Sequence, residues 1–450
     1  MEFECHSLDG ISNPDHIEAI CKEAIQSVDP YTGIHKKLKL VGNSLIADTH
    51  AFDLQQVGNI YVVGFGKASI PMAEAIEDVL GDRIKRGIVI SKQLISNCLK
   101  RILCLRGNHP IPGKDSVNST MQIVRMVEDL NSNDLVICLI SGGGSALFTW
   151  PNDNIGLEGM QRITDFLVKS GASIQEINSV RKCIDRVKGG EFANIIKPAQ
   201  LFSLILSDVL GDSPGMIASG PTVNEPEKIL QGMRVMEKYR TTINESDEKL
   251  LHLVNEIISK DYYQTDDKDI HENMDIYHLI IGSLSIALKS AEESAKRLGY
   301  QTRIIAEDIT GEAREIGRKL GKLLIKEAES KGESNPPVCL IAGGETTVTV
   351  TGNGKGGRNQ ELALGAAIEM DGYPNCILVA LATDGEDSTT DAAGAIVTGK
   401  TLQNGMMKNL DPEIFLKNND SYHYFEQAGG LIKTGPTGTN VNDMILMFVL

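Results

Sequence analysis

Short apolar runs alternate along this chain with amphipathic, helix-like stretches, and glycine bounds many of the runs. The run "NIYVVGFG" leads into "SIPMAEAIEDVLG", and "DLVICLISGGG" is followed by "GMQRITDFLVKSG". Short strands that are apolar on both faces and separated by helices are typical of a parallel sheet covered on both sides. The alternation therefore predicts an α/β fold.

A polar, acidic segment at residues 241–275 separates this pattern from a second α/β pattern. The second pattern runs from "IYHLIIGS" to the final "MILMFVL" and includes the β-like run "TTVTVTG" at 346–352. A chain of 450 residues is also too long for one small core. We predict two domains, residues 1–275 and 276–450. Gly-, Ser-, Thr- and Asp-rich loops follow strands in both, which indicates an active site in the cleft between them.

Charge and cysteine usage narrow the class of partner. A net charge of −16 and a pI near 5.1 argue against nucleic acid and against an acidic membrane. The apolar runs are far shorter than the ~18 residues of a membrane-spanning helix, and the N-terminus has no signal-peptide pattern. The eight cysteines are dispersed without a C-x-x-C pair, which is typical of a reducing compartment. We expect a soluble, cytoplasmic protein that acts on a small molecule; a homodimer is compatible with the sequence.

Two glycine-rich turns follow apolar strands in the first pattern. "GFGKAS" carries Lys67, and "SGGGSA" at 141–146 can expose several backbone N–H groups as an anion-binding nest. "GFGKAS" is close to the dinucleotide fingerprint, but no acid for the ribose follows "RGIVISKQ". A tight turn that only lets the next helix pack is the alternative for "SGGGSA", and a solvated surface lysine is the alternative for Lys67.

A third glycine-rich stretch, "GGETTVTVTGNGKGGRNQE" at 343–361, is predicted to start a helix at Arg358. A positive charge at a helix start is unfavourable unless an anion lies nearby. A flexible hairpin tip is the alternative, and the positive charge of Arg358 at the helix start argues against it. Asp208 and Asp384 each follow an apolar strand closely, although aspartates at such places are often N-caps or turn residues.

Cationic side chains, glycine-lined anion sites and several carboxylates together favour phosphoryl transfer. That reaction needs positioning, neutralisation of phosphate charge, and carboxylates for Mg²⁺ or for the attacking hydroxyl.

The motifs also resemble, in order and over nearly the whole chain, the class II glycerate 2-kinases with a C-terminal MOFRL domain. The resemblance rests on "GFGKAS", "GNHPIP", "LISGGGSAL", "SDVLGDSPGMIASGPT", "GGETTVTVTGNGKGGRNQE", "TDGEDSTTDAAGA" and "TGPTGTNVND". It implies a Rossmann-like N-terminal domain and a smaller MOFRL-type C-terminal domain. It further implies ATP-dependent, Mg²⁺-requiring phosphorylation of D-glycerate at the 2-hydroxyl, giving 2-phosphoglycerate and ADP.

The resemblance assigns roles to individual residues. The catalytic set is Lys67, Arg358, Asp208, Asp384 and Asn440, with Asp208 and Asp384 also available to the metal. The glycine-rich turns, and not the resemblance, predict the nucleotide-binding set, which is Gly142, Gly143, Gly144, Ser145, Gly343, Gly344, Glu345, Gly354 and Gly356. Which aspartate binds Mg²⁺ and which acts on the hydroxyl stays open. Ser388 stands where the family pattern has glycine, which leaves the shape of that loop open.

Two alternatives remain at this stage. One is an NAD(P)-dependent hydroxypyruvate reductase, since members of the family have carried that name. The other is a non-catalytic phosphosugar-binding protein, which would keep the glycine nests but has no use for paired acids and Lys67.

Overall fold

The structure is a computed structural model that describes residues 13–93, 99–244, 246–259, 276–332 and 335–450. The chain divides into two compact units, and each is described by itself. The N-terminal unit comprises residues 30–207 and 212–281. The C-terminal unit comprises 208–211, 282–450 and the described residues up to Asp29.

The N-terminal unit contains a six-stranded sheet in the order β6-β5-β4-β7-β8-β9. Its strands are β4 (Ile60–Phe65), β5 (Ile84–Ser91), β6 (Ile102–Arg106), β7 (Leu135–Ile140), β8 (Gln200–Leu206) and β9 (Ile276–Gly282). The pairs from β6 to β8 are all parallel. Counted along the chain, this is the Rossmann strand order 3-2-1-4-5-6, whose direction reverses between its first and fourth strands, here β4 and β7. A ligand site is therefore expected beyond the carboxyl ends of β4 and β7.

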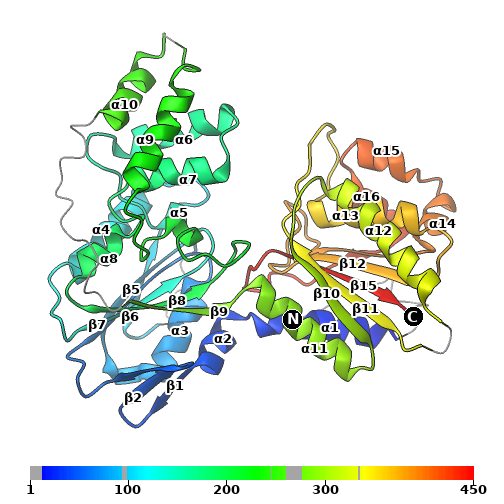
Figure 1. The fold of residues 1–450 in the computed structure, drawn as a ribbon, viewed down its shortest axis with the longest axis horizontal. Helices are drawn as coiled ribbons and strands as arrows, with labels where there is room; N and C mark the ends of the chain where they lie inside the picture. Colours follow the sequence, from blue (N-terminus) through cyan, green and yellow to red (C-terminus); the bar gives the residue numbers. More distant parts are fainter. Residues whose placement is uncertain (1–12, 94–98, 245, 260–275, 333–334) are drawn as a thin grey trace. The chain divides into compact units, whose positions relative to one another are not determined.

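Helices surround this sheet and extend into a separate helical layer (Figure 1). The helices of the unit are α2 (Pro30–Lys37), α3 (Ser69–Leu80), α4 (Lys114–Val127), α5 (Gly144–Leu147), α6 (Gly156–Lys169), α7 (Ile174–Cys183), α8 (Glu191–Ile196), α9 (Lys228–Arg240) and α10 (Glu248–Ile258), with short 3-10 turns at Gly81–Arg83 and Ile217–Ser219. Apolar side chains of α6, α7, α9 and α10 form a core of their own. A small antiparallel sheet, β1 (Leu38–Val41), β2 (Ser44–Ala47) and β3 (His50–Asp53), completes the unit.

The C-terminal unit contains a second six-stranded sheet in the order β10-β11-β15-β12-β13-β14. Its strands are β10 (Gln301–Ile309), β11 (Val338–Gly344), β12 (Cys376–Ala382), β13 (Gly394–Thr398), β14 (Leu431–Ile432) and β15 (Asp443–Val449). β10 and β11 are parallel, whereas every other pair is antiparallel. β15 lies between β11 and β12 and runs against both, so its first residue is level with their last residues.

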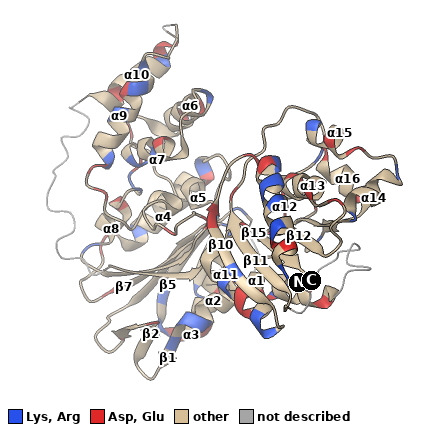
Figure 2. Cartoon of the chain, turned by 45° about the vertical axis from the view of Figure 1, so that its right-hand side comes forward, with Lys and Arg blue, Asp and Glu red and all other residues tan. Residues whose placement is uncertain are grey.

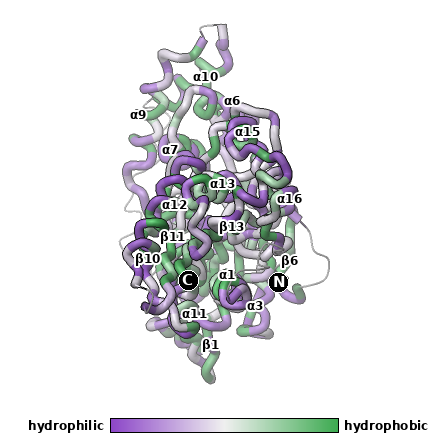
Figure 3. The backbone as a smooth tube through the Cα atoms, turned by 90° about the vertical axis from the view of Figure 1, so that its right-hand side faces the viewer, coloured by the Kyte–Doolittle hydropathy of each residue, from purple (hydrophilic) through white to green (hydrophobic). Residues whose placement is uncertain are grey.

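Helices cover both faces of this sheet: α1 (Pro14–Ser27) and α11 (Leu284–Arg297) on one, α12 (Ala313–Ser330) and α13 (Arg358–Met370) on the other (Figure 1). The short helices α14 (Thr401–Met406), α15 (Pro412–Lys417) and α16 (Ser421–Ala428) follow. The central strands carry few charged residues, while α12 carries many (Figure 2). Figure 3 shows the same division, with hydrophilic residues gathered on α12 and α15.

The predicted α/β class and the parallel N-terminal sheet are confirmed. Three details differ. "IYHLIIGS" forms β9, which ends the first sheet rather than beginning the second. Residues 346–352 form a loop with one isolated bridge at Thr347, because their threonines bond to other loops instead of to a strand. The second sheet is mostly antiparallel.

The predicted domain boundary at 275/276 adjoins residues 260–275, which lie outside the described residues. The structure groups the chain into non-contiguous units, because α1 packs on α11 of the C-terminal unit. In the part of the chain that the structure describes, no helix is long and apolar enough to cross a membrane.

Candidate active site

The turns that follow β4 and β7 are locked together. Lys67 N donates to Gly142 O at 2.9 Å, and Ala68 N donates to Ser141 Oγ at 3.0 Å. Gly66, at φ +127°, makes this approach possible, since a Cβ there would lie 2.1 Å from Ser141 Oγ. The predicted residues Lys67 and Gly142 are thus held side by side at the switch point of the Rossmann sheet.

The "SGGGSA" turn presents unpaired backbone donors. The N–H groups of Gly142, Gly143 and Ser145 have no acceptor among the described residues, whereas Gly144 N donates to Ser141 O. Gly143 adopts φ +77°, a left-handed conformation that turns successive N–H groups toward one side. We call residues 142–145 the nest; it has the form of an anion-binding turn.

The nest is fixed from beneath by two other segments. Ser145 Oγ lies 2.9 Å from Ser219 Oγ, and Ala218 packs where a Cβ of Gly144 would otherwise sit. Ala218 and Ser219 have φ of +52° and +64°, conformations that are strained for residues other than glycine. Lys188 Nζ donates to Ser145 O at 2.9 Å and to Phe148 O at 2.7 Å. Strained backbone and a buried lysine holding one turn in place are typical of a functional site.

The surroundings of the nest are positively charged. The Lys67 side chain is exposed, and its Cγ lies beside Gly143 together with the His109 ring. Burial lowers the pKa of His109, and the nearby Lys67 and Lys92 lower it further. Burial likewise lowers the pKa of Lys188 to about 8, although Asp185 opposes that shift. A neutral imidazole beside exposed and buried ammonium groups forms a setting suited to an anion.

In the C-terminal unit, Arg358 begins α13, as the sequence predicts, and its guanidinium group binds two carboxylates. Nε lies 2.6 Å from Asp443 Oδ2, Nη2 donates to Asp443 Oδ1 at 3.2 Å, and Nη1 donates to Glu345 Oε1 at 2.8 Å. Burial alone lowers the pKa of Arg358, but the two carboxylates outweigh burial and raise it above its ordinary value. Arg358 is therefore permanently charged.

Asp443 owes its place to the antiparallel strand β15. It pairs with Gly344 and Ala382, the last residues of β11 and β12. Its side chain is only 5% exposed, and burial raises the pKa of its carboxyl while Arg358 opposes that rise. A loop that precedes β15 thus reaches the same edge as the loops that follow β11 and β12.

The N-terminus of α13 already has an anion of its own. The buried Asp387 accepts hydrogen bonds from Asn359 N at 3.1 Å and from Gln360 N at 2.9 Å. A Cβ at Gly357 would lie 2.2 Å from the Asp387 carboxyl carbon. The helix start that the sequence suggested as an anion site is therefore capped by the carboxylate of Asp387.

The glycines assigned to nucleotide binding in this unit lie in tightly packed places. Gly344, in β11, would place a Cβ 2.1 Å from Ile309 O, and Gly343 would place one 2.8 Å from Leu284. Gly354 and Gly356 approach Asp420 and Ser421 in the same way, at 2.3 Å each. Packing therefore accounts for glycine at these positions without a ligand. Their nucleotide-binding role stays a prediction.

The remaining predicted residues gather around the loop that precedes β15. Thr437 N donates to Asp384 O at 3.2 Å, and Asn440 Oδ1 accepts from Asn442 N at 3.1 Å. Asn442 Nδ2 in turn donates to Asp208 O at 3.0 Å. One loop of the C-terminal unit thus contacts all three residues: Asn442 links Asn440 to the backbone of Asp208, and Thr437 bonds to the backbone of Asp384.

The acids at this loop offer carboxylate oxygen, the ligand type that Mg²⁺ prefers. Asp384 Oδ1 accepts a hydrogen bond from Glu386 N at 3.1 Å, and Asp384 Oδ2 has no hydrogen-bond donor among the described residues. No group of three or more His, Cys, Asp or Glu side chains is arranged for a metal in the described chain. This donor set suits a Mg²⁺ ion that brings most of its ligands with it, as Mg²⁺ bound to a nucleotide does.

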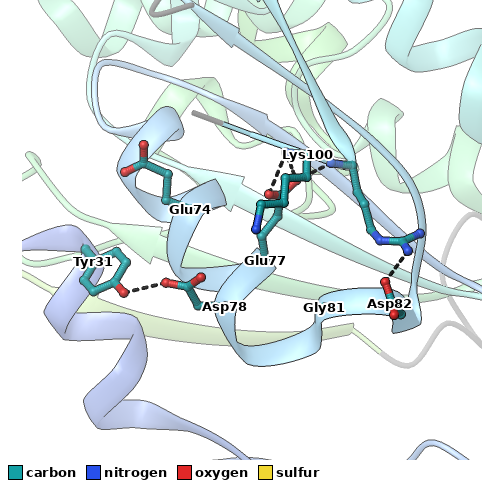
Figure 4. A pocket seen from close by; sticks show the side chains of 8 residues that line it. Tyr31, Glu74, Glu77, Asp78, Gly81, Asp82 and Lys100 are labelled. Carbon is teal, nitrogen blue, oxygen red and sulfur yellow. Dashed lines mark hydrogen bonds and ion pairs between the residues drawn. The ribbon is translucent and has the colours of Figure 1, made fainter. Parts of the chain in front are cut away.

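A pocket of about 450 Å³ in the N-terminal unit does not suit the binding of phosphate (Figure 4). Acids predominate among its charged lining residues, and it lies away from Lys67 and the nest. It is lined by acids of α3, including Glu74 and Asp78, and Tyr31 Oη donates to Asp78 Oδ2 at 2.5 Å. It also contains Gly81, at the end of α3, and Arg101, just before β6. That end of α3 lies at the amino edge of the sheet, opposite the edge that carries Lys67.

Sequence reasoning did not find three groups that the structure places at these sites. Asp387 and Asp443 stand in loop motifs that do not set them apart from their neighbours, because their burial depends on tertiary packing that the sequence does not display. Arg181, at the end of α7, lies beside the nest with Lys188. It belongs to an ordinary amphipathic helix, and no local signal sets it apart.

Two families match the chain. Residues 16–254 match the family described as "Domain of unknown function (DUF4147)", and residues 338–443 match the MOFRL family. A glycerate 2-kinase from Pyrococcus horikoshii is 39% identical, covering 95% of each chain. A D-glycerate 2-kinase from Thermotoga maritima is 41% identical, covering 87% of this chain and 91% of its own. The crystal structure of the Thermotoga maritima glycerate kinase covers 97% of this chain and 99% of its own, at 36% identity and a TM-score of 0.82.

Proposed function

Because the chain belongs to the family of glycerate 2-kinases built from a DUF4147 domain and a MOFRL domain, we propose the following reaction. The enzyme transfers the γ-phosphoryl group of ATP to the 2-hydroxyl of D-glycerate, giving 2-phosphoglycerate and ADP. The sequence resemblance to class II glycerate 2-kinases implies the same reaction.

The observation that carries the mechanism is the joined pair of turns at the switch point. The nest offers unpaired N–H groups, and Lys67 adds an exposed ammonium group from the adjoining turn. Phosphoryl transfer depends on positioning and on neutralising charge at the phosphate oxygens. We assign the nest to the phosphates of the nucleotide and Lys67 to the transferring group.

Arg358 supplies the second cation. Asp443 holds two of its nitrogens, so the guanidinium plane is oriented before any substrate arrives. The third contact, with Glu345, involves a carboxylate that is 48% exposed. An incoming phosphoryl oxygen can replace Glu345 there without disturbing Asp443. We therefore assign Arg358 to the transferring phosphoryl group.

Asp208, Asp384 and Asn440 supply the acid and amide groups. Nucleotide-bound Mg²⁺ would neutralise phosphate charge, and Asp384 is the candidate to hold it because one of its oxygens has no hydrogen-bond donor. Asp208 would then orient the 2-hydroxyl and accept its proton. Asn440 fixes the loop that joins the two acids, through its bond with Asn442 N.

The two alternatives fit the structure less well. Strand β5 ends in Ser91, and Lys92 follows, so an NAD(P)-dependent hydroxypyruvate reductase would lack the acid that binds the ribose. A phosphosugar-binding protein would need the nest but not a buried Asp443 that orients Arg358.

One assay tests the reaction and the metal together. The purified protein is incubated with ATP and Mg²⁺, with and without D-glycerate, and ADP release is followed. ADP is expected only when glycerate is present, and a chelator of Mg²⁺ should stop its formation. The product should be 2-phosphoglycerate rather than 3-phosphoglycerate. Oxidation of NADH with hydroxypyruvate at a comparable rate would instead establish the reductase.

A further inference from the structure

A small basic pocket opens beside the nest in the N-terminal unit. Its volume is about 170 Å³, and its walls include His109, Gly143, Ser145, Arg181 and Lys188. Pockets for drug-sized ligands hold roughly 300–1,000 Å³. This pocket is therefore suited to a ligand of a few heavy atoms rather than to a whole nucleotide.

The described residues that line the pocket include no carboxylate, and Arg181 in particular has none to balance its charge. The guanidinium group of Arg181 has no hydrogen-bond acceptor and no ion-pair partner in the described chain, and burial lowers its pKa. A partly buried arginine without a partner is unfavourable unless a ligand supplies the missing charge.

Lys188 adds positive charge, but its hydrogen bonds to the backbone hold its ammonium group away from a ligand. Its side chain is 1% exposed, and its ammonium group already donates to Ser145 O and Phe148 O. The nearest carboxylate, Asp185, lies 3.9 Å away and accepts hydrogen bonds from Trp150 N and Val187 N. Lys188 therefore fixes the pocket floor and contributes positive potential, while Arg181 is available for direct contact.

The other residues that line the pocket are mostly apolar, which suits contact with a short carbon chain. Pro110, Pro112, Ala146 and Met160 face the same space, and Gln161 Nε2 holds Pro112 O at 2.7 Å. A polyphosphate would arrive with Mg²⁺, which requires carboxylate ligands that this wall does not offer. A single carboxylate needs no metal and fits the planar fork of an arginine.

We propose that this pocket binds the carboxylate of the three-carbon acceptor and that Arg181 recognises it. The inference rests on the proposed function in taking D-glycerate as that acceptor. The pocket and the nest share Gly143 and Ser145. An acceptor anchored at Arg181 therefore lies next to a phosphoryl group bound at the nest.

Arg181→Gln tests the assignment, with Arg186→Gln as the matched control. Arg186 follows Arg181 closely in sequence but binds Asp153 and packs over Trp150, outside the pocket. Arg181→Gln should raise the KM for D-glycerate at least ~10-fold, as expected for the loss of one charge-assisted hydrogen bond, with the KM for ATP unchanged. Arg181→Lys should recover part of the loss. Arg186→Gln should match the wild type.

Calorimetry without ATP keeps the test independent of turnover. D-glycerate should bind the wild type and bind Arg181→Gln at least ~10-fold more weakly, whereas glycerol, which lacks the carboxylate, should bind neither. If the wild type binds D-glycerate but shows no kinase activity, the proposed function fails and the pocket assignment stands. Equal binding by wild type and Arg181→Gln, or a rise in the KM for ATP alone, would overturn the assignment. Thermal unfolding of each variant separates these outcomes from misfolding, in which case Arg181→Lys carries the test.

Discussion

Replacing Gly66 by alanine should separate the two turns that hold Lys67 against the nest. The Cβ of alanine would lie 2.1 Å from Ser141 Oγ and 2.5 Å from Ser141 O, so one turn has to move. That movement breaks the hydrogen bonds to Gly142 O and Ser141 Oγ, each worth about 1 kcal/mol. Positive-φ strain adds about 1–3 kcal/mol. We expect the free energy of unfolding to fall by about 3–5 kcal/mol in total.

The single tryptophan, Trp150, lies in the N-terminal unit, so its fluorescence in urea reports the unfolding of that unit. Displacement of Lys67 by an ångström should also reduce kcat ~10²-fold. Gly171→Ala is the control: its φ is +74°, but nothing lies within 4 Å of the added Cβ. The control should lose only about 1–2 kcal/mol and keep its activity. If Gly66→Ala matched Gly171→Ala in stability and turnover, the hydrogen bonds between the two turns would contribute neither to stability nor to the positioning of Lys67.

Three further predictions follow from individual side chains. Lys67→Ala should fold normally, because the side chain is exposed, and lose ~10²–10³ in kcat; wild-type turnover would make Lys67 a solvated residue. Arg358→Lys should lose at least ~10-fold in kcat/KM. It should also lose about 1.5–3 kcal/mol of stability, because the bond to the buried Asp443 is lost. Unchanged steady-state kinetics together with an unchanged melting temperature would contradict this prediction. Hydrogen bonds from Lys238 and from Ser173 N lower the pKa of Glu176 to about 2 from 4.5. The ionised Glu176 carboxylate therefore stabilises the fold above pH 4.5, and this stabilisation is lost as the pH falls to about 2. The difference in free energy of unfolding between wild type and Glu176→Gln should accordingly close over that range, as urea titrations at several pH values would show.

The strands and helices of the N-terminal sheet could be predicted because each element is encoded locally. Apolar runs next to glycine predict β4, β5 and β7, and their alternation with helices predicts the parallel sheet. Pairing between distant segments could not be predicted in the same way. β9 looks like the start of a new pattern, but it finds its partner in the first sheet. "TTVTVTG" has β propensity, yet its backbone N–H groups bond to the side chains of Glu312 and Asn419 instead of to a strand.

The candidate site likewise contains residues that sequence patterns predict and residues that only the fold brings together. Lys67, the nest and Arg358 stand at strand ends or helix starts, positions that sequence patterns mark. Asp443 reaches Arg358 only because β15 runs antiparallel to β11, which a rule based on the carboxyl ends of parallel strands does not foresee. Arg181 approaches the nest from a different helical layer, and nothing in its own helix predicts that approach.

The partners of Arg358 show how a cation can be both fixed and available. A guanidinium group without carboxylates would be mobile, whereas one held by two buried carboxylates would have most of its donors engaged and no partner that a substrate could easily replace. Asp443 is 5% exposed and Glu345 is 48% exposed. Replacing the exposed carboxylate with a phosphoryl oxygen exchanges one charge-assisted bond for another, and solvent can receive Glu345 at little cost because surface ion pairs are worth about 0–1 kcal/mol. One permanent and one exchangeable partner are the arrangement expected of an arginine that must be oriented before its substrate binds.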